Sequence, residues 1–153
     1  MAEIVSRSAA LIAAGTKVLP SALGGKKRCV VITSPAAAAW ADGDTVGAGF
    51  ALPAGVRFTC NSFFSHADMG TAVVAQLGIR DFATQVAIDA DGIGASLDVS
   101  AAAARTIANN GALVAAGVES VTTVPCEVYF SLTGAAATAN AQIRAEVEYL
   151  SND

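Results

Sequence analysis

The sequence predicts an all-β fold: an antiparallel β-sandwich preceded by an N-terminal arm, with at most one or two short helices. Its 153 residues suffice for one domain with a substantial core. Apolar and polar residues alternate in at least five short segments, and turn-forming residues separate several of them. Because successive side chains of a strand point to opposite faces, each segment has one dry and one wet face. Packing two sheets together buries the dry faces.

The beginning of the chain differs in composition from the rest. Residues 1–28 are predicted to form the N-terminal arm, and residues 29–153 the sandwich domain. Helical periodicity is present around Ile4–Ala14 and could end at Gly15. The first strand is expected at Cys29–Thr33, because a Ser-Pro pair follows and proline cannot continue a central ladder.

The alternating segments themselves predict the remaining strands. Their apolar positions are expected to face the core and their polar positions to face solvent. In the last segment, Val147 is expected inside and Glu146 and Glu148 outside, and Glu127 is expected outside in the segment before it. The five segments are Asp44–Leu52, Val56–Ser65, Thr71–Arg80, Cys126–Thr133 and Gln142–Leu150.

Turn chemistry marks the connections between these strands. Proline fixes φ and glycine admits positive φ, so Leu52-Pro53-Ala54-Gly55 predicts a chain reversal. His66–Gly70 supplies the next turn, whereas Asp89–Gly94 and Gly134–Asn140 predict loops. A further strand is expected at Val118–Val124.

Residues 95–118 admit two interpretations. Ser100 followed by Ala101–Ala104 is typical of a helix N-cap, with Asn110-Gly111 as the stop. The same Asn-Gly pair could instead turn a hairpin between Thr106–Ala108 and Ala112–Ala115. We favour a short helix or an irregular excursion.

Charge is divided unevenly along the chain. Residues 1–28 carry five basic side chains and one acidic one, a formal charge of +4, whereas the remainder carries four and twelve, or −8. This polarity is typical either of a solvated tail or of an arm that docks on an acidic surface of a partner or a neighbouring copy. Nucleic acid is not an expected partner, because the acidic body would repel phosphates. The candidate partner-binding residues are Arg7, Lys17, Lys26, Lys27, Arg28 and Trp40.

Trp40 is the only tryptophan and follows an alanine run. It is expected to be either a core plug or an interface anchor, with core packing favoured. Cys29, Cys60 and Cys126 are odd in number and lack a CxxC spacing, so free thiols are expected, the latter two on apolar strand faces.

The residue pattern predicts no catalytic, cofactor-binding or metal-binding site. His66, the only histidine, lies in a predicted turn and is expected to face solvent. Asp89-Ala90-Asp91-Gly92 begins like a calcium loop, but the later ligand positions hold Ile93 and Ser100. No apolar stretch is long enough for a membrane span and no signal peptide is evident, so we expect synthesis in a cytoplasm and no membrane partner.

Over about two thirds of its length the chain resembles a known family. The residues concerned read Asp-Gly-Asp-Thr-Val, Leu-Pro-Ala-Gly-Val, Ala-Gln-Leu-Gly-Ile-Arg-Asp and, near the end, Ala-Gln-Ile-Arg-Ala-Glu-Val-Glu-Tyr-Leu. They are similar to the small head decoration, or cement, proteins of tailed bacteriophages. The resemblance implies a jelly-roll-like sandwich that assembles as a homotrimer on the capsid exterior. It also implies a structural role in the virion, bracing neighbouring major capsid proteins.

Three other functions remain open at this point. The chain could be a different virion part, such as a head fibre, an adaptor or a tail protein. It could be a carbohydrate-binding sandwich module, although such sites need exposed aromatic platforms and the chain has one Trp and two Tyr. An enzyme is the least favoured, because no base–nucleophile pair is evident.

Overall fold

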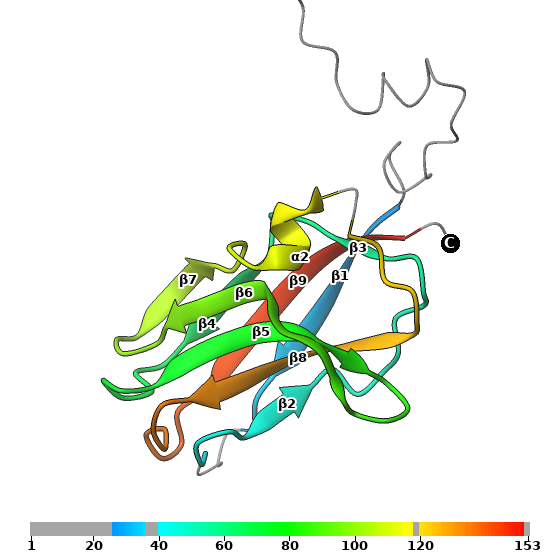
Figure 1. Ribbon diagram of the computed structural model, residues 1–153. Coiled ribbons are helices and arrows are strands. Elements are labelled where there is room, and N and C mark those ends of the chain that lie inside the picture. The colour runs from blue at the N-terminus through cyan, green and yellow to red at the C-terminus, as the bar shows by residue number, and fades with distance from the viewer. Residues whose placement is uncertain (1–25, 36–39, 118–119, 152–153) are drawn as a thin grey trace, which may run out of the picture.

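The computed structural model describes residues 26–35, 40–117 and 120–151, which form a two-layered β-sandwich (Figure 1). The predicted all-β fold is confirmed. The predicted helix around residues 4–14 and the candidate residues Arg7 and Lys17 lie outside the described residues. The elements are β1 (Lys26–Thr33), β2 (Thr45–Gly47), β3 (Arg57–Phe58), β4 (Phe63–His66), β5 (Val74–Asp81), β6 (Ala87–Asp98), β7 (Ala103–Ile107), a one-turn helix α2 (Ala112–Ala115), β8 (Cys126–Thr133) and β9 (Ile143–Ser151).

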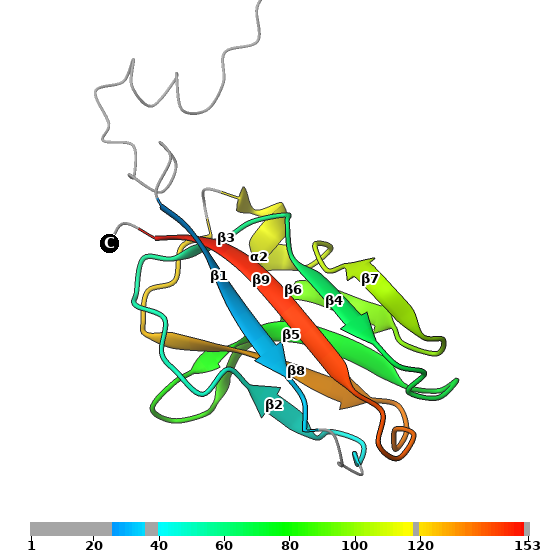
Figure 2. The same cartoon turned by 180° about the vertical axis from the view of Figure 1, so that it is seen from behind.

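The strands pair antiparallel in two sheets. One sheet has the order β1-β9-β4-β7, with the short β3 also paired to β9, and the other has the order β2-β8-β5-β6. The second sheet faces the viewer in Figure 1, and the first in Figure 2. Leaving β3 aside, the chain crosses between the sheets at almost every connection and gives the strand order of a jelly roll, as the resemblance implied.

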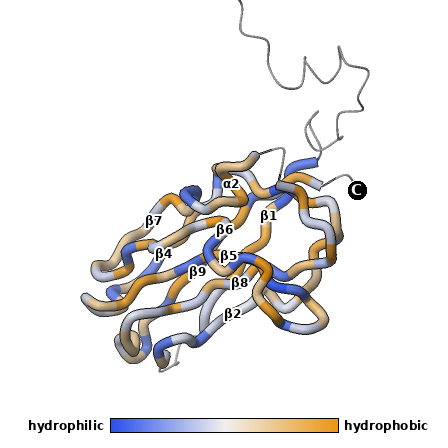
Figure 3. The backbone as a smooth tube through the Cα atoms, viewed as in Figure 1, coloured by the Kyte–Doolittle hydropathy of each residue, from blue (hydrophilic) through white to orange (hydrophobic). Residues whose placement is uncertain are grey.

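Apolar side chains fill the space between the sheets. On β9 the predicted inward residues Ala145 and Val147 are buried and Arg144 is exposed, so the alternation is confirmed. On β5 the predicted inward residues Leu77 and Ile79 are also buried. Figure 3 shows hydrophobic and hydrophilic residues interspersed along the strands of both sheets. Each large side chain buried in this way stabilises the fold by about 1.5–3 kcal/mol.

Strand β8 lies where it was predicted, but both of its faces are covered. Glu127 was expected in solvent, and only 3% of it is exposed. β8 lies between β2 and β5, and Gln85 from the β5–β6 connection donates a hydrogen bond to the Glu127 carboxylate. The connection therefore covers the outer side of the strand, which residue alternation alone cannot reveal.

Two predicted strands are interrupted. Asp44–Leu52 is a strand only at Thr45–Gly47, because Gly49, at φ +79°, bends the chain away and leaves Phe50 exposed. Val56–Ser65 is divided into β3 and β4 by irregular residues. Cys60 lies in this break and is exposed, so its predicted place on an apolar face is wrong.

The loop predicted at Asp89–Gly94 is wrong, because these residues belong to β6. The pairing of β6 with β5 has several register shifts, as expected for a bulged edge strand. Gly78 on β5 makes this possible: a side chain there would overlap the backbone of Asp89 and Ala90. The turn-forming residues are thus accommodated within a strand.

Each interpretation of residues 95–118 is correct only in part: a short helix is present, but at Ala112–Ala115, and Thr106 and Ile107 are in a strand, but one that pairs with β4. Ser100 does not begin a helix; its amide instead donates to the Asp98 carboxylate, and the chain continues into β7. Pairing of β7 with β4 overrides the helix propensity of the alanines. Gly111 precedes α2 rather than ending a helix, and Ala112–Ala115 is helical rather than the second strand of a hairpin.

The strand predicted at Val118–Val124 is wrong over its described part, residues 120–124. Thr122 instead exchanges backbone hydrogen bonds with the 52–55 turn and its neighbour Val56. That turn is confirmed, with Gly55 at φ +91°, and so is the loop at 134–140. β1 contains the predicted strand but begins at Lys26, three residues before Cys29.

Candidate functional site

The outer side of the five-stranded sheet is not covered by any described segment, and we call it the open face (Figure 2). It consists of the outward side chains of β1, β9, β4 and β7, together with Asn61. Strand register aligns one row of these side chains across the four strands, namely Val31, Glu146, Phe63 and Ile107. Val31 is 48% exposed and Ile107 55%. This row therefore carries three apolar side chains and one charged one.

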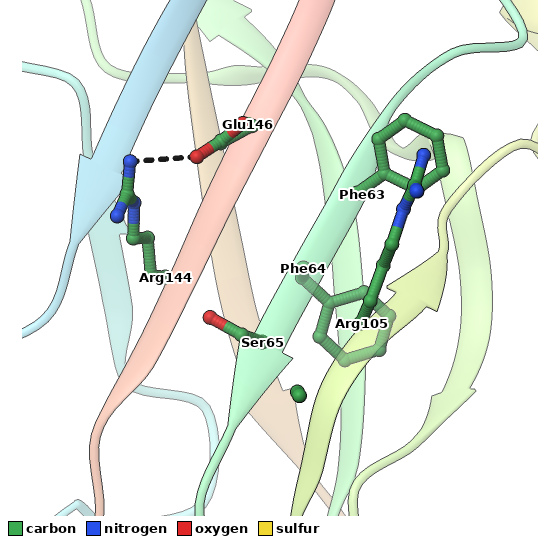
Figure 4. A pocket seen from close by; sticks show the side chains of 7 residues that line it. Phe63, Phe64, Ser65, Arg105, Arg144 and Glu146 are labelled. Atoms are coloured by element: carbon green, nitrogen blue, oxygen red, sulfur yellow. Dashed lines mark ion pairs between the residues drawn. The ribbon is translucent and has the colours of Figure 1, made fainter.

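A hollow of about 350 Å³ lies on the open face between β9, β4 and β7 (Figure 4). The guanidinium carbon of Arg105 is 3.6 Å from the centre of the Phe63 ring, a cation–π contact. On the other side, Arg144 Nη2 lies 2.6 Å from Glu146 Oε1, and Ser65 lies between the two arginines. Because Arg105 and Arg144 both line the hollow, it can offer hydrogen-bond donors to an acidic or polar group.

Glu148 organises the other end of the open face. Its Oε1 accepts hydrogen bonds from Thr59 Oγ1 at 2.6 Å and Asn61 Nδ2 at 3.2 Å, and Lys27 Nζ lies 3.3 Å away. The hydrogen bond from Thr59, followed by those from Asn61 and Lys27, lowers the pKa of the Glu148 carboxyl despite partial burial. The carboxylate therefore holds β1, β9 and the segment before β4 together.

The outward side chains of the open face carry a slightly positive charge, although the chain as a whole is acidic. Lys27, Arg105 and Arg144 stand against Glu146 and Glu148, a formal charge of +1, whereas the other described residues carry four basic and eight acidic side chains, or −4. Lys26 and Arg28 are exposed near the start of β1 but have the phase of the buried Val30, so they are not counted on the open face.

The structure brings some of the predicted partner-binding residues together and separates others. Lys26, Lys27 and Arg28 lie in β1, at the edge of the open face. Trp40 is only 5% exposed and packs against Phe130, with ring centres 6.0 Å apart, so it is a core residue as favoured.

Sequence reasoning did not identify Arg105, Arg144 or Phe63 as site residues. Arg144 lies on the polar face of a correctly predicted strand, and that signal could have identified it. Arg105 could not have been found, because the strand that positions it was not predicted.

A second exposed surface lies on the other sheet, at the β5–β6 hairpin (green in Figure 1). We call it the hairpin surface. It carries the acidic side chains Asp81, Asp89 and Asp91 and five exposed apolar ones, Phe50, Phe82, Val86, Ile88 and Val124. A backbone hydrogen bond from Phe82 N to Pro125 O ties the hairpin to the neighbouring loop, and one from Asp81 N to Val86 O closes the hairpin itself. Burial, followed by the proximity of Asp91, raises the pKa of the Asp89 carboxyl.

The buried Glu127 connects the segments that form the hairpin surface. Its carboxylate accepts hydrogen bonds from Gly49 N at 2.6 Å, Arg80 Nε at 2.8 Å and Gln85 Nε2 at 3.2 Å. These donors come from three segments, the loop carrying Phe50, strand β5 and the β5–β6 connection. Burial opposes ionisation, but the three hydrogen bonds outweigh it and lower the pKa of the Glu127 carboxyl.

Groups that could carry chemistry are dispersed. His66 was expected in solvent but is 7% exposed, because it stacks on Phe64 and its Nδ1 lies 2.9 Å from the Ala67 carbonyl oxygen. Cys29 and Cys60 are exposed, Cys126 is buried, and all three are free. Within the described ranges, no three His, Cys, Asp or Glu side chains converge in a metal-binding arrangement.

Two further observations concern the described part of the chain. None of its helices has the length and apolar character to cross a membrane. The tryptophan and both tyrosines, Tyr129 and Tyr149, are at most 7% exposed, so none of them forms the aromatic platform that the carbohydrate-binding alternative needs.

Comparison with known proteins gives structural similarity but no sequence family. No protein-family model and no curated protein matches the sequence. A chain in the capsid of Ralstonia phage GP4 is similar, with a TM-score of 0.64 and 13% identity over 84% of this chain and 86% of that one. Chains of the cyanophage Pam1 capsid (TM-score 0.43, 17% identity, 83% and 86% covered) and of the acidic stable capsid of Helicobacter pylori bacteriophage KHP30 (0.42, 12%, 85% and 92%) are less similar. The first similarity, unlike the other two, is close enough to establish a shared fold.

Proposed function

We propose that the chain is a structural subunit of a phage head. The observation that supports this most is the fold shared with a chain of the Ralstonia phage GP4 capsid over more than four fifths of both chains. The exposed surfaces agree with such a role, because apolar and charged side chains lie together on two sides of the sandwich. Head proteins act through surfaces of this kind rather than through a catalytic cleft.

Within the head, we assign the chain to the decoration, or cement, class. It would bind the outer surface as a homotrimer and brace neighbouring major capsid proteins. The motifs described under sequence analysis support this assignment, as does the small size of the sandwich. Binding to an assembled shell would also stabilise the domain, because a partner that binds only the folded state adds to its stability.

Deleting the gene from the phage that encodes the chain tests the proposal. Mutant particles are examined by cryo-electron microscopy and mass spectrometry, and their DNA release is followed on heating. A decoration subunit predicts complete heads that lack outer density and release DNA at a lower temperature than wild type. Loss of tail, fibre or neck density would instead assign the chain to one of those parts, and unchanged particles would refute a structural role.

We also propose that residues 1–28 act as an arm that contacts the shell. Because β1 begins at Lys26, the informative truncation removes residues 1–25 and leaves the strand intact. The truncated protein is added to heads that lack the chain, and its occupancy is compared with that of the full chain. Full occupancy by the truncated protein would exclude the arm as a shell contact.

A further inference from the structure

The two exposed surfaces of the sandwich share an unusual feature. Seven large apolar side chains are exposed among the described residues, and all seven lie on the open face or the hairpin surface. Val31 and Ile107 are on the first, and the other five are on the second. Exposed apolar groups gathered in this way mark contact surfaces more often than scattered ones do.

The charges of the two surfaces are complementary. The outward side chains of the open face carry a formal charge of +1, with Arg105 and Arg144 lining the hollow, and the hairpin surface carries Asp81, Asp89 and Asp91. The only described arginine beside those aspartates, Arg80, is already paired with Glu127 at 2.8 Å. A basic apolar surface and an acidic apolar surface therefore exist on the same molecule, and opposite potentials of this kind steer association.

These surfaces cannot meet within one molecule, because they lie on opposite sheets of the sandwich (Figures 1 and 2). We propose that the open face of one copy binds the hairpin surface of a second copy. The contact is heterologous, so repeating it generates a ring if the rotation closes. Phe82 and Val86 are exposed on the hairpin, and the open face is hollowed beside Phe63 and Arg105, so the hollow offers a place for an apolar side chain of the second copy.

Charge reversal on each surface tests the contact in the purified full-length chain. Arg105→Glu changes the open face and Asp91→Lys changes the hairpin surface. Sedimentation equilibrium measures self-association of each variant, of wild type and of Thr71→Glu, a control that adds a negative charge on an exposed loop outside both surfaces. Thermal unfolding confirms that each variant is folded, and Ile107→Ser replaces Arg105→Glu if the latter is not.

Each reversal should weaken self-association by about ten-fold or more, because it places like charges opposite each other. An equimolar mixture of the two reversed variants should associate more tightly than either variant alone, since each supplies the charge that its partner lost wherever the two alternate. Raising the salt concentration should weaken the wild-type complex. A wild-type chain that stays monomeric, variants that behave like the Thr71→Glu control, or a mixture that does not recover would each overturn the inference.

A contact between copies would explain how the proposed head subunit assembles, so it rests on the proposed function. The two are refuted by different measurements. Self-association is measured without heads, whereas the head role is measured on particles. A self-associating chain that is absent from heads would refute only the head role. A monomeric chain that decorates heads would refute only this contact and would assign the open face to an acidic surface of another capsid protein.

Discussion

Replacing Glu127 by glutamine should destabilise the fold strongly. Only 3% of the Glu127 side chain and 16% of the Arg80 side chain are exposed, and their charged groups lie 2.8 Å apart. Glutamine keeps the shape of the side chain but removes its charge, so Arg80 is left without its counter-charge. One of the donors, Gly49 N or Gln85 Nε2, would also face the amide NH₂ group instead of an oxygen.

The size of the effect follows from these contacts. Removing one partner of a buried ion pair costs about 3–5 kcal/mol. Arg80 retains some exposure and glutamine retains one acceptor, so we expect the lower end of that range, about 3 kcal/mol. At about 2–4 °C per kcal/mol for a chain of this size, the midpoint of thermal unfolding should fall by about 6–12 °C.

Urea unfolding monitored by tryptophan fluorescence measures the loss, since Trp40 is buried in the core. Glu148→Gln is the matched control. Its carboxylate also accepts several hydrogen bonds, but 23% of its side chain and 65% of that of Lys27 are exposed. An exposed pair of this kind contributes at most about 1 kcal/mol. If Glu127→Gln loses no more stability than Glu148→Gln, then burial does not govern this ion pair and the reasoning is wrong.

The pH dependence of the same variant follows from the lowered pKa of Glu127. Its folded-state pKa lies below the ordinary value of 4.5, so its contribution to stability is fully present above that pH. The contribution is lost as the pH falls from there through the folded-state pKa. The stability difference between wild type and Glu127→Gln should therefore be constant near neutral pH and shrink in acid. A difference that grows in acid would contradict the assignment.

Two further predictions concern packing and access. Gly47→Ala should destabilise by about 1–3 kcal/mol in thermal unfolding, because a Cβ there would overlap Arg80 and Glu127. Gly43→Ala, which meets open space but keeps φ +87°, should cost about 1 kcal/mol, and an equal cost at both sites would contradict the overlap. In thiol titration, the exposed Cys29 and Cys60 should react in the native state. Cys126 should react only on unfolding, because it is buried and burial raises its pKa to about 11. Rapid reaction of all three thiols in the native protein would show that Cys126 is accessible and would contradict this prediction.

The sequence predicted those parts of the fold in which local pattern and tertiary environment agree. β5 and β9 have one face in the core and one outside, so residue alternation located them and their inward side chains. β6 and β7 were missed because their environment decides their conformation. The turn-forming residues of β6 are accommodated by bulges over Gly78, and the alanines entering β7 are held extended by β4.

The candidate site was less predictable than the fold for a related reason. Glu127 occupies an outward position of its strand, as the residue alternation predicted. That outward side is covered by the β5–β6 connection, whose Gln85 lies 42 residues away in sequence. Burial on the outer side of a sheet depends on where a distant loop lies, and no local pattern encodes that position. A solvated carboxylate was therefore expected where the structure has a buried anchor.

Charge shows most clearly how the fold changes the meaning of a sequence feature. Along the chain, Lys26, Lys27 and Arg28 appear as the end of a basic leader on an acidic body. In the structure they begin β1 and share a sheet with Arg105 and Arg144, which lie far away in sequence. Within the described residues, part of the charge polarity therefore belongs to two faces of one sandwich. Two such faces on a rigid scaffold can order copies in a fixed geometry.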